Sequence, residues 1–229
     1  MNSEPSWLRR FVTEKTYPYR TILTTWRILT RDFGHGRSAF RRESVDAHGR
    51  EVPWYSYPAI EYLEQLDFRQ KNVFEFGCGN STVYWARHSA RVVSVESNRL
   101  WRDKMKPRLP SNAELLLTDS PATYVDALAR RAEEFDVIVV DADERRACAE
   151  AAAKKLRRGG LIILDNSDWH HEAAAVLRAA NLIEVDLAGF TPINNYTTTT
   201  SFFFHREFDF PRRHDRQPVH GIGALRCGL

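Results

Sequence analysis

From residue 72 onward, the chain alternates short apolar runs with amphipathic or alanine-rich stretches. The apolar runs are rich in β-branched and aromatic residues, which predicts buried strands. The intervening stretches predict helices, and the clearest covers residues 144–158 and ends at two glycines. Repeated strand-helix units predict an α/β fold with a doubly wound parallel sheet. The predicted strands of this part are residues 73–76, 91–96, 113–117, 135–140 and 161–164.

The C-terminal part continues this pattern and then changes it. A helix is predicted for residues 172–180, followed by strands at 182–187 and 197–205 with a long loop at 189–196 between them. These two strands are expected to run antiparallel to each other, so the sheet should be mostly parallel with an antiparallel last strand. Residues 206–229 are rich in Pro and Arg, which indicates an irregular arm or a subunit contact.

The N-terminal part has its own pattern. Residues 7–33 mix apolar and arginine positions, which predicts two short amphipathic helices separated near Pro18. Their apolar faces are expected to pack on the rest of the chain or on a second subunit, with a membrane surface as the alternative. His35 and His48 fall in predicted loops and do not make a metal site. We divide the chain into a basic helical extension (1–50), a main domain (51–205) and an irregular arm (206–229).

Composition supports one domain with an extension. The 229 residues are 43% hydrophobic, which is enough for a core. Residues 1–50 hold 10 Lys and Arg against 5 Asp and Glu, whereas residues 51–204 hold 18 against 22. The basic flank could contact phosphate groups or a membrane surface, but the acidic main part does not suit a nucleic-acid binder.

The number and spacing of the cysteines indicate whether the protein works in a reducing or an oxidising compartment. Cys78, Cys148 and Cys227 are odd in number and lack metal or redox spacing, so we expect free thiols in a reducing environment. No apolar run approaches the roughly 20 residues that a membrane span needs. We therefore expect a soluble cytoplasmic protein.

Residues 72–86 predict a buried strand, a glycine turn and the start of a helix. Gly77 and Gly79 let the backbone bend and approach a ligand closely, and Ser81 or Thr82 can cap the helix that follows. This arrangement places a ligand, most simply a nucleoside, at a helix N-terminus. A dinucleotide fingerprint needs a third glycine at position 82, where this chain has threonine, so a dehydrogenase is disfavoured.

With Glu75 directly before it, the turn reads acid-x-Gly-x-Gly and resembles the first motif of class I S-adenosylmethionine-dependent methyltransferases. The resemblance implies a Rossmann-like, seven-stranded sheet in which Glu75 and the turn hold the methionine end of the cofactor. Glu96 ends the second strand, where an acid accepts hydrogen bonds from ribose hydroxyls. Asp119 and Ser120 follow the third strand and could meet the adenine, cap the next helix, or do both.

Trp54 and Tyr57 precede a helix predicted for residues 59–66. The resemblance implies that this segment closes over the cofactor, and ordinary core packing is the alternative. The predicted cofactor-binding residues are Trp54, Tyr57, Glu75, Gly77, Cys78, Gly79, Asn80, Ser81, Glu96, Ser97, Asp119 and Ser120.

Acids also follow the fourth and fifth strands. Asp141 ends one strand, and Asp165 and Asn166 end the next. If these strands are neighbours, their oxygen atoms meet and form a set suited to Mg²⁺ or Mn²⁺. The pattern, with Trp169 shortly after, resembles the cation-dependent O-methyltransferases of the catechol and caffeoyl-coenzyme A type. Asp141 facing cofactor or substrate without a metal is the alternative.

One position departs from that resemblance. The family commonly has a lysine three residues after the first metal ligand, and this chain has Glu144 there. His170 and His171 could include a general base near the metal, with a surface histidine pair as the alternative, and we take His170 and Asp141 as the candidate catalytic residues. Trp169, Asn194 and Tyr196 are expected to contact the acceptor, because loops at this end of such a sheet often bind substrate.

The sequence thus predicts an S-adenosylmethionine-dependent methyltransferase, with a divalent cation assisting O-methylation of a small-molecule hydroxyl. A metal-independent N- or O-methyltransferase of the same fold is the first alternative. A nucleoside-binding module that acts through its basic arms is the second. No Asn/Asp-Pro-Pro-aromatic motif follows the fourth strand, so nucleic-acid bases are not expected as acceptors. The N-terminal extension could form a homo-oligomer.

Overall fold

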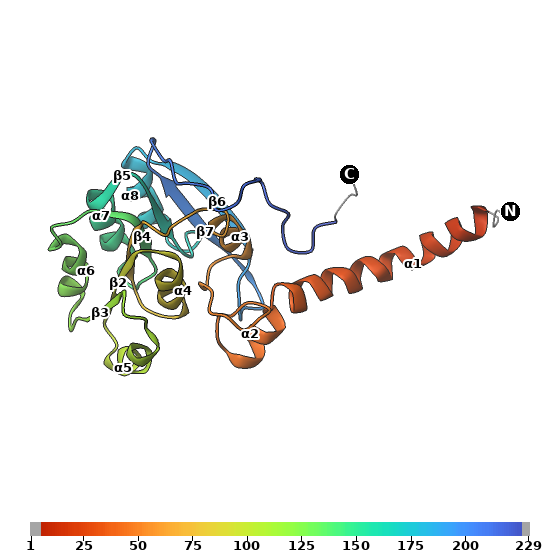
Figure 1. Cartoon of the computed structure of the whole chain (residues 1–229), viewed down its shortest axis with the longest axis horizontal. Coiled ribbons are helices and arrows are strands. Elements are labelled where there is room, and N and C mark those ends of the chain that lie inside the picture. The colour runs from red at the N-terminus through yellow and green to blue at the C-terminus, as the bar shows by residue number, and fades with distance from the viewer. Residues whose placement is uncertain (1–5, 226–229) are drawn as a thin grey trace.

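A seven-stranded sheet forms the centre of the molecule (Figure 1). The computed structural model describes residues 6–225, with the backbone alone for residues 6–13 and 15, so Cys227 lies outside the described residues. The strand order is β3-β2-β1-β4-β5-β7-β6, and only β7 runs antiparallel to its neighbours, which confirms the predicted fold class. The strands are β1 (Asn72–Phe76), β2 (Arg91–Glu96), β3 (Ala113–Leu117), β4 (Phe135–Val140), β5 (Leu156–Leu164), β6 (Ile183–Phe190) and β7 (Thr197–Phe204).

Two hydrophobic layers cover the sheet because side chains alternate between the faces of each strand. In β1, Val73 contributes to one layer, and Phe74 and Phe76 contribute to the other. Helices α3 and α4 supply the first layer, and α6, α7 and α8 supply the second. The helices of the main domain are α3 (Tyr57–Leu63), α4 (Asn80–His88), α5 (Arg99–Met105), α6 (Pro121–Ala129), α7 (Arg145–Lys155) and α8 (His171–Ala179), with a 3₁₀ turn at η2 (Lys106–Arg108).

The carboxyl ends of the parallel strands meet at one edge of the sheet. Val140 at the end of β4 pairs with Phe76 of β1 and with Leu164 of β5. The backbone N–H groups of the next residues continue this alignment, with Asp141 donating to Phe76 and Asp165 donating to Val140. The polar residues that follow these strands are therefore brought together, as ligands in such sheets require.

The boundary between α7 and β5 differs from the prediction. A helix was predicted through residue 158, but α7 ends at Lys155 and β5 begins at Leu156, which pairs with Phe135 of β4. Pairing with the sheet overrides the helix propensity of this segment. The strand predicted at 182–187 is also longer than expected, because β6 continues to Phe190 and pairs there with Thr197, whereas β7 ends at Phe204, one residue before its predicted end.

The N-terminal prediction of two helices was wrong, since one helix, α1 (Ser6–Arg27), runs through Pro18. Proline lacks an N–H group, and the helix continues past it here despite the lost hydrogen bond. The helix projects from the body of the molecule (Figure 1) and is followed by a short π-helix, η1 (Ile28–Asp32). Helix α2 (His35–Arg41) replaces the loop predicted near His35. No helix of the described chain is long and apolar enough to cross a membrane.

The C-terminal segment, residues 206–225, contains no named helix or strand. Phe210 is buried against Phe68, with ring centroids 5.7 Å apart, and the backbone oxygen of Pro211 accepts a hydrogen bond from Asp67. From residue 211 to residue 225 the side chains are exposed. The first few residues of this segment thus complete the core beside α3, and the rest lies on the surface.

The difference in burial predicts that two tryptophans contribute very different amounts to the free energy of unfolding. Trp85 is fully buried and packs edge-to-face on Phe68 at 5.1 Å, whereas Trp26 on α1 is 65% exposed. We expect Trp85→Ala to lower the free energy of unfolding by about 3–5 kcal/mol, because it leaves a cavity. Trp26→Ala should change it by less than about 0.5 kcal/mol. Urea unfolding followed by circular dichroism measures both, and a large loss in Trp26→Ala would show that α1 is packed in solution.

Candidate active site

The glycine turn lies directly against the end of β4. Gly77 has a positive φ of 103°, and a Cβ atom there would come within 2.6 Å of the backbone oxygen of Asp141. Only glycine fits this position. Gly79 is different, because its backbone is extended and the nearest atom to an added Cβ would be the Ser81 hydroxyl at 3.9 Å. The space in front of Gly79 is therefore open to a ligand.

A buried carboxyl group underlies the turn. Glu75 is 1% exposed, and its Oε2 accepts hydrogen bonds from the hydroxyls of Thr82 and Ser94. Burial raises its pKa to about 7, although these hydrogen bonds oppose the shift. The Thr82 hydroxyl also accepts the backbone N–H of Gly79 at 3.0 Å. Thr82, which marked only a departure from the dinucleotide pattern in the sequence, therefore connects the turn to Glu75.

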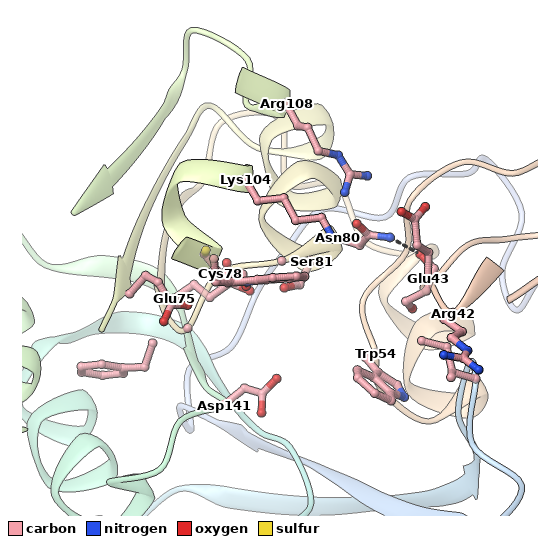
Figure 2. Close-up of a pocket in the computed structure, with 17 residues that line it drawn as sticks. Arg42, Glu43, Trp54, Glu75, Cys78, Asn80, Ser81, Lys104, Arg108 and Asp141 are labelled. Carbon is pink, nitrogen blue, oxygen red and sulfur yellow. Dashed lines mark hydrogen bonds between the residues drawn. The ribbon is translucent and has the colours of Figure 1, made fainter. Parts of the chain in front are cut away.

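A cavity of about 370 Å³ opens above the turn (Figure 2). It contains most of the predicted cofactor-binding residues, namely Trp54, Glu75, Gly77, Cys78, Gly79, Asn80, Ser81 and Glu96, together with Asp141. The amide of Asn80 donates to the backbone oxygen of Ser44 at 2.8 Å, which attaches the segment after α2 to the start of α4. The N-terminal extension therefore forms one wall of the cavity.

Several residues of this cavity were not predicted from the sequence. The indole of Trp101 donates to the backbone oxygen of Cys78 at 2.7 Å and supports the turn. Three basic side chains also line the cavity: Arg42, Lys104 and Arg108. Arg108 donates to Glu51, and the ammonium of Lys104 lies 4.9 Å from the Trp101 ring centre. The excess of basic residues in the extension was the only signal for Arg42.

A second cavity, of about 400 Å³, adjoins the first and shares Gly77, Glu96 and Asp141 with it. It also contains Ser97, Asp119 and Ser120, so the residues predicted for the adenosine half lie together. One oxygen of Glu96, Oε1, accepts the backbone N–H groups of Ser97 and Asn98, at 2.9 and 2.7 Å. The Cys78 side chain also interacts with the Glu96 carboxylate, which lines both cavities. Ser120 caps α6 as predicted.

A third cavity, of about 320 Å³, meets the first at Trp54 and Asp141. The residues predicted for metal and for acceptor all line it: Asp141, Asp165, Asn166, Trp169, Asn194 and Tyr196. The rings of Trp169 and Tyr196 lie 5.9 Å apart and form an aromatic wall. The structure thus brings the residues predicted for metal and for acceptor together in one cavity.

Two of the oxygen atoms that line this third cavity already accept hydrogen bonds from an arginine side chain. Nη2 of Arg145 donates to Asp141 Oδ1 at 2.7 Å and to Asn166 Oδ1 at 2.9 Å. The Arg145 side chain is 11% exposed. Asp165 Oδ1 accepts the Thr200 hydroxyl at 2.7 Å. The predicted ligand set thus does not fit a divalent ion as it stands, because a guanidinium lies between two of its oxygens.

The two carboxyl groups of the cavity influence each other. Burial raises the pKa of Asp141, and Arg145 opposes this shift. Burial and the nearby charge of Asp141 raise the pKa of Asp165 well above its usual value. Such displaced pKa values are common where carboxyl groups take part in proton transfer.

Two predicted site residues lie elsewhere. Tyr57 is buried, contacts the ring of Phe33 and hydrogen-bonds to His35 at 3.2 Å, and it lines none of the three cavities. His170 lines none of the three cavities but lines a neighbouring hollow, which shares Trp169 with the third cavity and also contains Arg145. Burial lowers the pKa of His170. Its predicted role as a base therefore gains no support from its position.

Residues 74–167, from β1 to just past β5, match a protein-family model described as a methyltransferase domain. This segment is a methyltransferase domain. The resemblance to class I S-adenosylmethionine-dependent methyltransferases is thereby confirmed. No curated protein sequence matches the chain.

Solved structures show that this methyltransferase shares its fold with several transferases. An O-methyltransferase from Streptomyces achromogenes, TomG, in complex with S-adenosylmethionine has 16% identity and a TM-score of 0.52, covering 74% of this chain and 88% of that chain. A precorrin-6y C5,15-methyltransferase from Geobacter metallireducens has 13% identity and a TM-score of 0.51, covering 64% and 86%. Spermidine synthase from Thermotoga maritima has 15% identity and a TM-score of 0.50, covering 68% and 60%. These likenesses show the fold and do not name the acceptor.

The open space at Gly79 yields a test of cofactor placement. Gly79→Arg should abolish detectable binding of S-adenosylhomocysteine in titration calorimetry, because its side chain would enter the first cavity. Gly79→Ala should bind within a few-fold of the unchanged chain, since the added Cβ meets no atom closer than 3.9 Å. Equal affinity in all three proteins would mean that the cofactor lies elsewhere.

Glu75 should make stability depend on pH. The unfolded chain releases this proton near its usual pKa of 4.5, and the folded chain releases it near 7, so the folded state holds more protons between these values. Stability from this group is complete below about pH 4.5 and is lost as the pH rises through about 7. The loss is on the order of 3 kcal/mol. Urea unfolding across this range should show a smaller decline in Glu75→Gln, and an identical decline would contradict the assignment.

Proposed function

We propose that this methyltransferase transfers the methyl group of S-adenosylmethionine to a hydroxyl oxygen of a small molecule held in the third cavity. The meeting of the cavities at Trp54 and Asp141 is the observation that carries this proposal. If adenosine lies beside Glu96 and Asp119 and the methionine end lies above the glycine turn, the sulfonium is near that meeting point. An acceptor in the third cavity then faces the methyl group.

The size and lining of the third cavity support a small acceptor. A volume of about 320 Å³ lies at the lower end of small-molecule sites. Trp169 and Tyr196 offer aromatic surfaces to a ring, and Asn194 and Asn166 offer amides to its polar groups. The proposal therefore includes a small-molecule partner and no nucleic acid.

Asp141 is proposed as the group that takes the proton of the acceptor. Arg145 bonds to its Oδ1, and Oδ2 has no hydrogen-bond partner among the residues that the structure describes. The acceptor oxygen forms a bond to the methyl carbon, and the carbon–sulfur bond breaks with its electron pair remaining on sulfur. The hydroxyl proton passes to Oδ2 of Asp141. The positioned carboxylate thus contributes general base catalysis and orientation.

The divalent ion of the sequence prediction is not part of this proposal, because Arg145 already bonds to two of its three expected ligands. A cytoplasmic location remains part of it. Cys78 and Cys148 are free thiols, as expected in a reducing compartment.

Labelled S-adenosylmethionine and a panel of phenols, sugars and polyketide alcohols test the reaction, with mass spectrometry of the product to locate the methyl group. Asp141→Asn should lower kcat by about 10²–10⁴-fold, because general base catalysis contributes this much. It should leave S-adenosylhomocysteine affinity within a few-fold. Asp126→Asn on the exposed side of α6 is the matched control. Methylation of nitrogen alone, or full activity of Asp141→Asn, would overturn the proposal.

A further inference from the structure

Arg145 forms an unusually complete set of hydrogen bonds at the edge of the acceptor site. It is the first residue of α7, and its side chain turns back toward the ends of β4 and β5. Nε donates to the backbone oxygen of Asp165 at 3.2 Å, and Nη1 donates to that of Ala142 at 2.6 Å. With the two bonds from Nη2, four of the five N–H groups of this guanidinium have partners.

The two hydrogen bonds from Nη2 place the positively charged guanidinium between Asp141 and Asn166. One nitrogen atom lies within 2.7 Å of the carboxylate of Asp141 and within 2.9 Å of the amide oxygen of Asn166. A divalent ion bound to the same oxygens would need distances of about 2.1 Å for Mg²⁺. Such an ion and the guanidinium would occupy the same space, and their like charges would repel each other at this separation.

The bonds to backbone oxygens resist displacement of the side chain. Because the oxygens of Asp165 and Ala142 belong to the chain at the ends of β5 and β4, the guanidinium is held by the sheet itself. Moving Arg145 aside would leave these oxygens and the Asp141 carboxylate without their hydrogen-bond donor, at a place where the Arg145 side chain is mostly buried and that of Asp141 is partly buried. The geometry thus favours the guanidinium over an exchangeable ion.

We propose that Arg145 is the fixed cation of this site, standing in place of a divalent metal and holding Asp141 in position. This inference rests on the proposed function in assigning the cavity to the acceptor. Arg145 acts as a positioning residue, since it orients one oxygen of Asp141 and leaves the other toward the cavity. The unchanged protein should therefore bind divalent ions here only weakly, and removing the guanidinium should create a tighter site for one.

Manganese titration followed by electron paramagnetic resonance tests the proposal without any acceptor. The unchanged protein should bind Mn²⁺ only weakly, whereas Arg145→Ala should bind it at least tenfold more tightly through Asp141, Asp165 and Asn166. The double variant Arg145→Ala/Asn166→Ala should lose most of that gain. Arg145→Lys keeps a positive charge and should gain little. Arg146→Ala removes an exposed neighbouring arginine and is the matched control.

Binding of S-adenosylhomocysteine checks that each variant is folded. Tight Mn²⁺ binding by the unchanged protein that Asp165→Asn removes would overturn the proposal, and this result needs no folded Arg145→Ala. A folded Arg145→Ala that binds Mn²⁺ no better than the unchanged protein would overturn it as well. If the manganese results are as expected but no hydroxyl is methylated, the proposed function fails and the assignment of Arg145 as the fixed cation stands.

Discussion

The glycine turn can lie against the end of β4 only because residue 77 has no side chain. This close approach of Gly77 to the backbone oxygen of Asp141 lies directly after the paired carboxyl ends of β1 and β4. The three cavities depend on it, since Asp141 lines all of them and Gly77 lines two. The buried Glu75 stabilises the turn from below through Thr82, so the position of the cofactor site follows from the packing of a few residues at one edge of the sheet.

The same edge concentrates acidic groups, and their charge has to be balanced. Glu75 and Asp165 are buried, and their raised pKa values favour the protonated form. Burial raises the pKa of Asp141 as well, but its cationic partner Arg145 opposes that shift. Acidic groups at this edge of the sheet favour a cationic ligand, and the guanidinium favours the ionised form of Asp141. Arg145, at the start of α7, thus contributes positive charge to the third cavity, whereas the sequence pattern around it predicted only a helix.

Sequence patterns predicted the cavity residues that follow strand ends, but they did not predict the cavity residues that come from helices and from the N-terminal extension. Glu96, Asp119 and Asp141 could be placed because the end of each apolar run is visible in the sequence, and parallel strands align these ends. Arg145, Trp101 and Arg42 could not be selected, because their roles depend on where helices and the N-terminal extension fold back onto the sheet. The end of α7 was misplaced for a related reason, since pairing of Leu156 with Phe135 is a long-range contact.

The central claim is that cofactor and acceptor meet at Asp141, between the first and third cavities. A crystal structure of the protein with S-adenosylhomocysteine tests it most directly. The account predicts adenine beside Asp119 and Ser120, ribose beside Glu96, and the thioether sulfur facing the cavity lined by Trp169 and Tyr196. Density for the ligand outside the first two cavities, or a sulfur atom turned away from Asp141, would contradict it.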